Sequence, residues 1–355
     1  MHRALDKLKA LGPDDPGHTL RNQGKSPWLT SAKFKLVDAC NLRCFMCDYW
    51  KGKRAGELST DEVKTAITGL SRLGCQKIHF TGGEVFIRSD AVAIFQHAID
   101  LGIRVNLTTN GTRGSKDDYR KILKMPVRSI TLSIDGPVAK VHDRFRGRKG
   151  AFKDTLKTLD RLLTHRKKKT RIRINTVIHA GNIHTVPEMV HLFEERPIDG
   201  WLLIPMDPKS QAEGVLSMND IRAYNATIAP LLSERVQIPD FDPYVFGRDE
   251  KDLDYATKGQ WARGYYKTHP CHIPSYHTLI DSRGDVYPCC MGHRSVEPLG
   301  NIRTTSIEAI FQGDTYQDFR LGMHKNRLDI CHRCDDFTKD NRAINRLLRS
   351  WKSPA

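Results

Sequence analysis

The sequence has no long hydrophobic run. No stretch approaches the roughly 20 consecutive apolar residues that a membrane-spanning helix needs. Residues 1–10 are basic, but they hold no apolar segment of the kind found in a secretory signal peptide. Internal repeats and low-complexity segments are absent as well. These absences argue against a membrane or secreted protein, and we expect a soluble cytoplasmic chain with no membrane partner.

The spread pairs of cysteine that a disulfide framework needs are lacking. The nine cysteines are odd in number and gather in tight clusters rather than in spread pairs. In a cytoplasmic chain such clusters indicate metal sites, because cytosolic reductants keep thiols from pairing.

Acidic residues are too few to balance the basic ones, which leaves a formal net charge of +16. A basic surface suits an anionic partner. The longest basic run, residues 166–169, falls at the expected end of a helix, where the helix dipole favours cations. It also lacks the interleaved aromatic residues of a single-strand binding platform. We therefore disfavour nucleic acid as a partner.

Apolar residues alternate between strand and helix periodicity from residue 33 onward. Strands are predicted at 33–38, 78–80, 104–108, 129–134, 171–178 and 201–204, and helices at 59–73, 89–101, 115–124, 151–166, 186–195 and 217–234. Such alternation requires parallel strands covered by helices. Six units are too few for a closed eight-fold barrel. The sequence therefore predicts an α/β fold built on a partial (β/α)6 barrel, with its chemistry at the carboxyl ends of the strands.

Composition divides the chain into five expected segments. Residues 1–30 form a short leader, 31–235 the barrel, 236–268 a linker rich in Pro, Asp and Gly, 269–336 a small cysteine-bearing domain, and 337–355 a basic helical tail of unknown role.

Three cysteines, Cys40, Cys44 and Cys47, follow the first strand directly. Three thiolates on one short loop can hold a [4Fe–4S] cluster and leave one iron open for a chelating cosubstrate. The alternatives are a zinc site that lacks its fourth ligand, or three buried structural cysteines. Zinc sites favour paired C-x2-C spacings with a Cys or His that completes the tetrahedron, and no fourth cysteine lies near this loop.

This loop, its place after the first strand and the six-fold alternation resemble the radical S-adenosylmethionine (SAM) superfamily. The motifs that the family carries after later strands are also present, namely Thr-Gly-Gly-Glu at 81–84, Thr-Asn-Gly at 109–111, Ser-Ile-Asp-Gly at 133–136 and the segment 142–147. The resemblance implies that six residues contact SAM: Gly82, Gly83, Glu84, Asn110, Ser133 and Asp135. Glycine lets the backbone approach a ligand closely, and a carboxylate suits the ammonium group of SAM. Val85 and Met46 depart from the family pattern without removing a ligand.

A second set of four cysteines lies in the C-terminal part: Cys271, Cys289, Cys331 and Cys334. A predicted hairpin at 280–286 brings the first two together, and the C-x2-C pair can supply the other two. The arrangement resembles the shorter "twitch" variant of the SPASM family, which carries one auxiliary [4Fe–4S] cluster, and the segment 299–302 adds to that resemblance. A four-cysteine zinc site is the alternative. Cys290 is either a spare thiol or a hydrogen-atom donor to a substrate radical.

The resemblance implies an enzyme with two [4Fe–4S] clusters and SAM. SAM is cleaved to a 5′-deoxyadenosyl radical that abstracts hydrogen from the substrate, and the auxiliary cluster transfers electrons. A low-potential donor such as flavodoxin or ferredoxin would be its partner. Because only about thirty residues precede the first strand, we expect oxidation, epimerisation or decarboxylation of a sugar, cyclitol or nucleotide-linked small molecule. The alternatives are oxidative maturation of a peptide or protein, and, from another class, a non-catalytic zinc-binding module that interacts with RNA.

Overall fold

One continuous sheet organises the molecule. The computed structural model describes residues 5, 6, 8, 9, 24, 26, 28–167, 169–207, 214–239, 241–325 and 328–351. Most of the expected leader 1–30 lies outside the described residues. The strands of the sheet are β1 (Ser31–Val37), β2 (Lys77–Gly82), β3 (Arg104–Thr109), β4 (Ser129–Ser133), β5 (Arg171–Ile178), β6 (Gly200–Pro205), β7 (His277–Ile280) and β8 (Val286–Tyr287).

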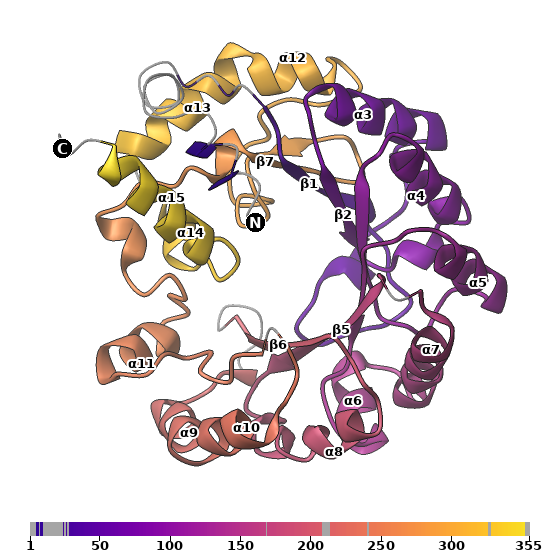
Figure 1. Cartoon of the computed structure of the whole chain (residues 1–355), viewed down its shortest axis with the longest axis vertical. Coiled ribbons are helices and arrows are strands. Elements are labelled where there is room, and N and C mark those ends of the chain that lie inside the picture. Colours follow the sequence, from indigo (N-terminus) through magenta and orange to yellow (C-terminus); the bar gives the residue numbers. More distant parts are fainter. Residues whose placement is uncertain are drawn as a thin grey trace.

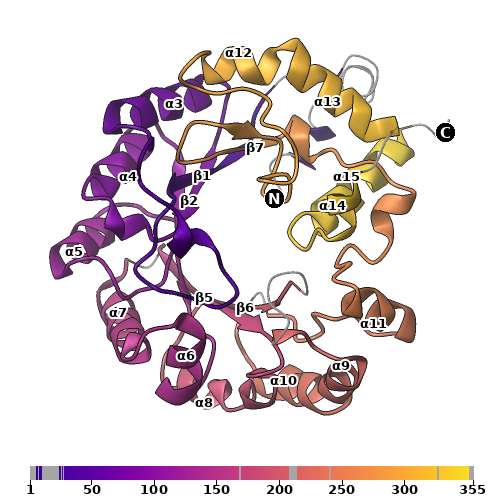
Figure 2. The ribbon, with the colours of Figure 1, turned by 180° about the vertical axis from the view of Figure 1, so that it is seen from behind.

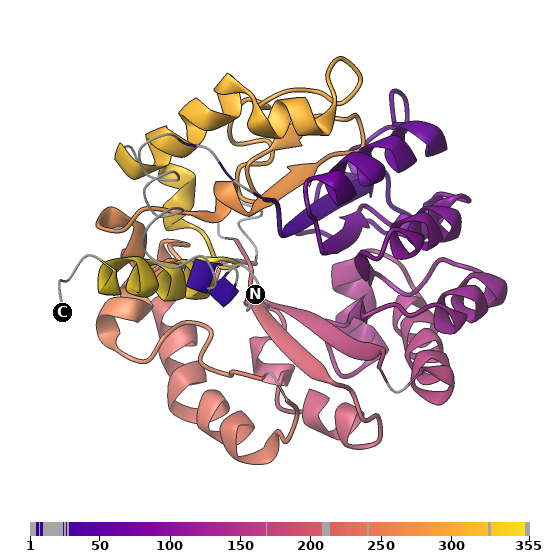
Figure 3. The ribbon, with the colours of Figure 1, turned by 45° about the horizontal axis from the view of Figure 1, so that its top comes forward.

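The strand order is β6-β5-β4-β3-β2-β1-β7-β8. Strands β1 to β6 are parallel and curl into an open barrel, as Figure 1 shows. This confirms the predicted α/β fold with a partial six-stranded barrel. The sheet does not stop at β1, however, because β7 pairs parallel with it in a register that sets Ser31 opposite His277. The C-terminal part therefore continues the barrel sheet (Figure 3).

Helices cover the outer side of this sheet (Figure 2). They are α3 (Thr60–Arg72), α4 (Ala91–Asp100), α5 (Lys116–Lys124), α6 (Ala139–Arg146), α7 (Ala151–His165), α8 (Met189–Glu194), α9 (Met218–Ala223) and α10 (Ala229–Arg235). Capping boxes begin α3, α5 and α9, where the first serine and an acidic residue three positions on satisfy each other's backbone N–H groups. The sequence pattern missed α6, and the helix expected at 217–234 is interrupted by a π-turn at Tyr224–Ile228. None of the helices in the described part of the chain combines the length and apolarity needed to span a bilayer.

The two faces of the sheet differ in chemistry. On β1, Ala32, Phe34 and Leu36 are fully buried in the main hydrophobic core between sheet and helices. The alternate residues, among them Lys33 and Lys35, face the inside of the barrel, because successive strand residues point to opposite sides. The side chains that point into the barrel are therefore polar, and they could contact a ligand there.

The segment 236–268, expected to be a linker, contributes to the core. It forms helix α11 (Glu250–Thr257), and Phe246, Leu253 and Ala256 are buried in the same hydrophobic cluster as the barrel helices. The C-terminal part then adds α12 (Ile307–Gln312), α13 (Asp314–Lys325), α14 (Asp329–His332) and α15 (Thr338–Ser350). Helix α15 falls in the segment expected to be a basic tail.

Candidate functional site

The loop that carries the first three cysteines leaves the carboxyl end of β1 and is held by the end of α6. The backbone N–H of Arg43 donates to the carbonyl of Arg146 at 3.2 Å, and that of Phe45 to the carbonyl of Phe145 at 3.2 Å. Cys40, Cys44 and Cys47 pack into one small apolar cluster with Leu42 and Ala151. The structure thus brings the three predicted ligands together at the end of the barrel where the chemistry was expected.

The two glycines after β2 are required by backbone packing. Gly82 has φ +134°, in the region that favours glycine. A Cβ on Gly83 would lie deep inside the van der Waals radius of the Ala39 carbonyl oxygen. The N–H of Gly83 donates to the Val37 carbonyl at 2.8 Å, and the N–H of Glu84 to the Ala39 carbonyl at 3.0 Å. The glycines therefore let the end of β2 lie against the chain that enters the cysteine loop.

The Glu84 carboxylate is fully buried and accepts three hydrogen bonds from the protein. Its oxygens accept from the N–H of Phe86 at 3.2 Å, the hydroxyl of Thr109 at 2.7 Å and the N–H of Asn110 at 2.7 Å. Burial raises the pKa of Glu84. The side chain thus ties the end of β2 to the end of β3, and its predicted contact with the SAM ammonium stays a prediction.

Asn110 and Asp135 reach the cysteine loop in different ways. The amide nitrogen of Asn110 lies 3.7 Å from the sulfur of Cys40. Asp135 is fully buried and pairs with Arg146 at 2.7 Å, and another guanidinium nitrogen of Arg146 lies 3.8 Å from the sulfur of Cys44. Ser133 is the last residue of β4 and precedes Asp135 by two positions in the chain. Sequence reasoning did not single out Arg146, although it lies in the 142–147 segment that carried the resemblance.

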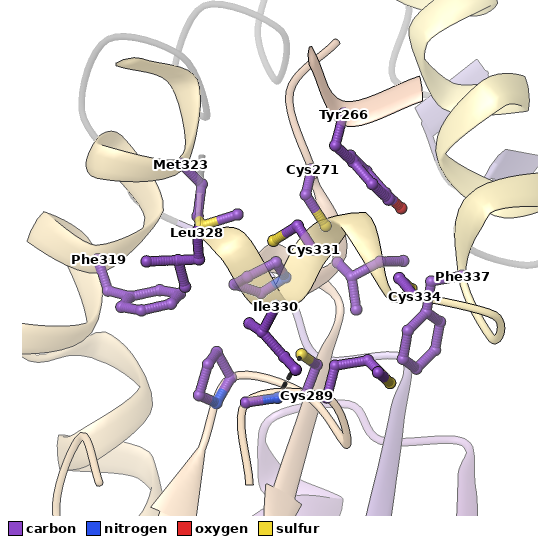
Figure 4. A pocket seen from close by; sticks show the side chains of 15 residues that line it. Tyr266, Cys271, Cys289, Phe319, Met323, Leu328, Ile330, Cys331, Cys334 and Phe337 are labelled. Carbon is purple, nitrogen blue, oxygen red and sulfur yellow. Dashed lines mark hydrogen bonds between the residues drawn. The ribbon is translucent and has the colours of Figure 1, made fainter. Parts of the chain in front are cut away.

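The four later cysteines line one small cavity. Figure 4 shows Cys271, Cys289, Cys331 and Cys334 placed around this cavity, and all four belong to its wall. The rest of the wall is apolar apart from the Tyr266 hydroxyl: Ile273, Pro274, Pro288, Met291, Gly292, Phe319, Met323, Leu328, Ile330 and Phe337.

Burial makes these four thiols hard to ionise by themselves. Burial, with a smaller contribution from the nearby Cys289, raises the pKa of Cys331 to about 11 and that of Cys334 to about 12. A cationic metal cluster would compensate four thiolates in so apolar a place. The donor set and the dry wall therefore fit a cluster with four cysteine ligands.

A larger cavity of about 770 Å³ occupies the barrel interior. Residues of β1, β2, β3, β5 and β6 line it together with residues of the C-terminal part, including His277, Cys290 and Asp336. The Asp336 carboxylate accepts from the Lys33 ammonium at 3.3 Å and from the Cys290 thiol at 3.3 Å. Ligand sites in proteins commonly have about 300–1,000 Å³, so this cavity has the size of a substrate site.

Comparison with known families agrees with this geometry. A family described as the radical SAM superfamily matches residues 34–193, and one described as an iron–sulfur cluster-binding domain, SPASM, matches residues 271–335. The chain therefore contains a radical SAM domain and a SPASM iron–sulfur cluster-binding domain. The two matched ranges contain the two sets of cysteines, and these domains imply [4Fe–4S] clusters and SAM as cofactors.

Radical SAM relatives resemble the chain over part of their length. It is 30% identical to an AdoMet-dependent heme synthase of Nitratidesulfovibrio vulgaris over 54% of the chain and 52% of the relative. It is 28% identical to a PqqA peptide cyclase of Rhodopseudomonas palustris over 70% of the chain and 68% of the relative. The chain spans about half the length of the first curated relatives it matches. The crystal structure of Streptococcus suis SuiB bound to S-adenosylmethionine has the same fold, with a TM-score of 0.69 at 16% identity over 90% of this chain and 76% of that one.

These findings change the expected substrate. The sugar, cyclitol or nucleotide-linked substrate finds no support among the relatives, and the peptide alternative fits them better. The short segment before the first strand carried the earlier expectation, and it says nothing about which molecule enters the barrel. The zinc-binding, RNA-interacting module also finds no support, because the matching families are radical SAM and iron–sulfur families.

Proposed function

We propose that this radical SAM protein oxidatively modifies a peptide substrate. The observation that carries the proposal is the large cavity, whose wall comes from both the barrel strands and the cysteine-bearing C-terminal part. The part of the wall that comes from the C-terminal region includes Cys290 and Asp335, the chain neighbours of Cys289 and Cys334. Relatives that include a PqqA peptide cyclase and the mycofactocin maturase MftC support a peptide as the substrate.

In this proposal the two sets of cysteines have different roles. Cys40, Cys44 and Cys47 hold a cluster with one open iron. Together with SAM, this cluster would supply two steps: the reductive cleavage of SAM and the abstraction of hydrogen from a C–H bond. The four later cysteines hold an auxiliary cluster that has no open iron, so it is suited to electron transfer. A low-potential protein such as flavodoxin or ferredoxin is the proposed donor.

The polar groups around the first site place SAM. The Gly82–Glu84 turn, Asn110 and the Ser133–Asp135 segment all lie at the carboxyl ends of adjacent strands. Their backbone and amide groups would orient the amino acid part of SAM. The buried ion pair of Asp135 with Arg146 fixes this end of the barrel beside Cys44.

The Cys290 thiol reaches the substrate cavity. Burial raises the pKa of Cys290, so the sulfur keeps its hydrogen. It therefore has the protonation state that the predicted role of hydrogen-atom donor needs. A Cys290→Ala variant that cleaves SAM normally but yields a different peptide product would support that role, and an identical product would leave Cys290 as packing.

Heme synthases among the relatives favour a second candidate substrate, a heme precursor. Lys77 and Arg104 lie in the cavity wall and would suit a ligand that carries carboxylates, although the wall also contains Asp242, Asp335, Asp336 and Asp340.

The proposal is tested by SAM cleavage in the anaerobically reconstituted full-length chain. We expect 5′-deoxyadenosine from the wild type and none from Cys44→Ala, because a three-cysteine cluster loses a ligand. Cys75→Ala is the matched control, since Cys75 is also a buried free cysteine but lies in neither set. Short peptides encoded beside the gene and heme precursors are then assayed by mass for loss of hydrogen. Normal SAM cleavage by Cys44→Ala would contradict the assignment, and oxidation of a heme precursor alone would select the second candidate.

A further inference from the structure

Helix α15 lies beyond both matched families, and the sequence assigned it no role. Its residues Ile344 and Leu348 pack with Leu8 and Tyr276 in a small hydrophobic cluster. Its other buried residues include two asparagines one turn apart, Asn341 at 0% exposure and Asn345 at 7%. Buried amides need hydrogen-bond partners, so the partners of these two side chains show what the helix does.

Asn341 reaches a sulfur of the second cysteine site. The two N–H bonds of its amide nitrogen have three acceptors within reach: the Cys271 sulfur at 3.5 Å, the Tyr266 hydroxyl at 2.8 Å and the Phe337 carbonyl at 3.1 Å. Its amide oxygen accepts from the backbone N–H of His272 at 2.8 Å. One side chain therefore contacts both the Cys271 sulfur and the backbone of the next residue.

A hydrogen bond to a ligand sulfur affects the cluster that the sulfur holds. The N–H group stabilises negative charge on sulfur, and a cluster gains one negative charge when it is reduced, so the donor favours the reduced form. The effect is stronger in an apolar surrounding than in water, because the dipole is less screened. The wall around Cys271 is apolar and buried.

We propose that Asn341 is a positioning residue that tunes the auxiliary cluster. It donates a hydrogen bond to the Cys271 sulfur and thereby holds the reduction potential of the cluster higher than it would otherwise be. Helix α15 then acts as a cap of the cluster site. The inference rests on the proposed function, through the assignment of Cys271 as a ligand.

Asn345 provides a matched control on the same helix. Its amide nitrogen donates to the Tyr265 hydroxyl at 2.8 Å and to the Pro270 carbonyl at 3.1 Å. Its amide oxygen lies 3.0 Å from a ring nitrogen of His272. Both asparagines thus anchor α15 to residues 265–272, but of the two only Asn341 contacts a sulfur of this set. The Cys289 sulfur accepts from the backbone N–H of Gly292 at 3.3 Å, a bond that neither substitution removes.

The experiment uses the full chain with Cys40, Cys44 and Cys47 replaced by alanine, so that only the auxiliary cluster is assembled. Asn341→Leu and Asn345→Leu are compared in this background, with Asn341→Ala as a smaller second variant. The readouts are iron content and the midpoint potential from a redox titration followed by electron paramagnetic resonance. We expect about four irons per chain throughout. The midpoint should shift to a more negative potential in both Asn341 variants and stay at the background value in Asn345→Leu.

Several results would overturn the inference. An Asn341→Leu midpoint equal to that of Asn345→Leu would show that the amide does not tune the cluster. Loss of iron from both Asn341 variants would show a structural role instead. A Cys271→Ala variant in the same background tests the auxiliary site on its own. If this variant keeps its iron and its spectrum, Cys271 is not a ligand, and the proposed function fails at its auxiliary site rather than at Asn341.

Discussion

At the residue scale, the first cysteine loop depends on the groups packed against it as much as on its sulfurs. Gly83 has no side chain because the Ala39 carbonyl occupies that space. Arg146 brings a buried positive charge to Cys44 and to Asp135. Removing one partner of such a buried pair costs about 3–5 kcal/mol, because the other charge is left uncompensated. The loop geometry is therefore set by residues that bind no metal.

Substitution of Gly83 tests this dependence. In Gly83→Ala the added methyl group overlaps the Ala39 carbonyl and displaces the chain that enters the cysteine loop. We expect iron to fall from about eight to about four per chain, because only the auxiliary cluster is retained. The measurement is iron and sulfide content after anaerobic reconstitution.

Gly322 in α13 is the control glycine. A Cβ there meets nothing within 4 Å, and alanine is favoured over glycine inside a helix. Gly322→Ala should keep about eight irons per chain. A full complement of iron in Gly83→Ala would refute the packing explanation.

A buried histidine predicts how stability varies with pH. His277 is 6% exposed, and its ring nitrogen Nδ1 lies 2.9 Å from the Ser31 hydroxyl. Burial, together with Lys33 and Lys77, lowers the pKa of His277 to about 3. Between about pH 6.5 and pH 3 the unfolded chain binds a proton that the folded chain does not, so the free energy of unfolding falls as the pH falls.

Replacement of His277 should remove part of this pH dependence. From pH 7.5 to pH 5.5 the wild type should lose about 1.4 kcal/mol more stability than His277→Gln, because that interval extends one pH unit below 6.5. Denaturant unfolding at both pH values measures the difference. His165→Gln, at an exposed position, should behave as the wild type does, and an equal slope in all three proteins would refute the assignment.

At the element scale, two helices outside the predicted barrel and the predicted cysteine-bearing domain belong to the packed structure. Helix α11 lies in the segment whose composition suggested a linker, yet its inner face joins the main core. Helix α15 likewise brings the buried Asn341 to the second cysteine site. Both helices are polar on most of their surface, and that is why composition did not reveal what their few buried residues contact.

A core substitution in α11 distinguishes a packed helix from a linker. Leu253 is 4% exposed, and Leu253→Ala should lower the free energy of unfolding by about 2–5 kcal/mol through lost burial and the cavity left behind. Lys251→Ala, at an exposed position of the same helix, should change it by less than about 0.5 kcal/mol. Denaturant unfolding measures both variants. Similar small effects in the two would mean that α11 behaves as a linker.

At the scale of the whole molecule, the barrel and the C-terminal part share one sheet. Strand β7 pairs with β1 over four residues, and the Lys33–Asp336 ion pair links the two parts across the cavity. Two parts joined in this way are expected to unfold together, because separating them breaks strand hydrogen bonds and exposes the core.

Hydrogen exchange can test this coupling. Amides of β1 and β7 should exchange with the same opening free energy, since their shared hydrogen bonds break in one step. Mass spectrometry of peptides that cover 31–37 and 277–280 gives both rates. Much faster exchange in 277–280 than in 31–37 would indicate that the C-terminal part opens as an independent domain.

The sequence by itself determined the elements of the barrel and the two sets of cysteines. Periodicity and capping are local properties, so six strands and most of the helices could be placed from neighbouring residues alone. The cysteine spacings and the ordered motifs after the strands indicated the family, because ligands on a short loop are close wherever the loop lies. These signals depend on short stretches of chain and do not need the fold.

Only the tertiary structure decided which distant groups meet. The pairing of β7 with β1, the cavity between the two parts and the contact of Asn341 with Cys271 join residues that lie tens to hundreds of positions apart. No local pattern encodes such contacts, because they result from the closure of the whole sheet and from the packing of helices against it. For the same reason the length of the segment before the first strand could not identify the substrate.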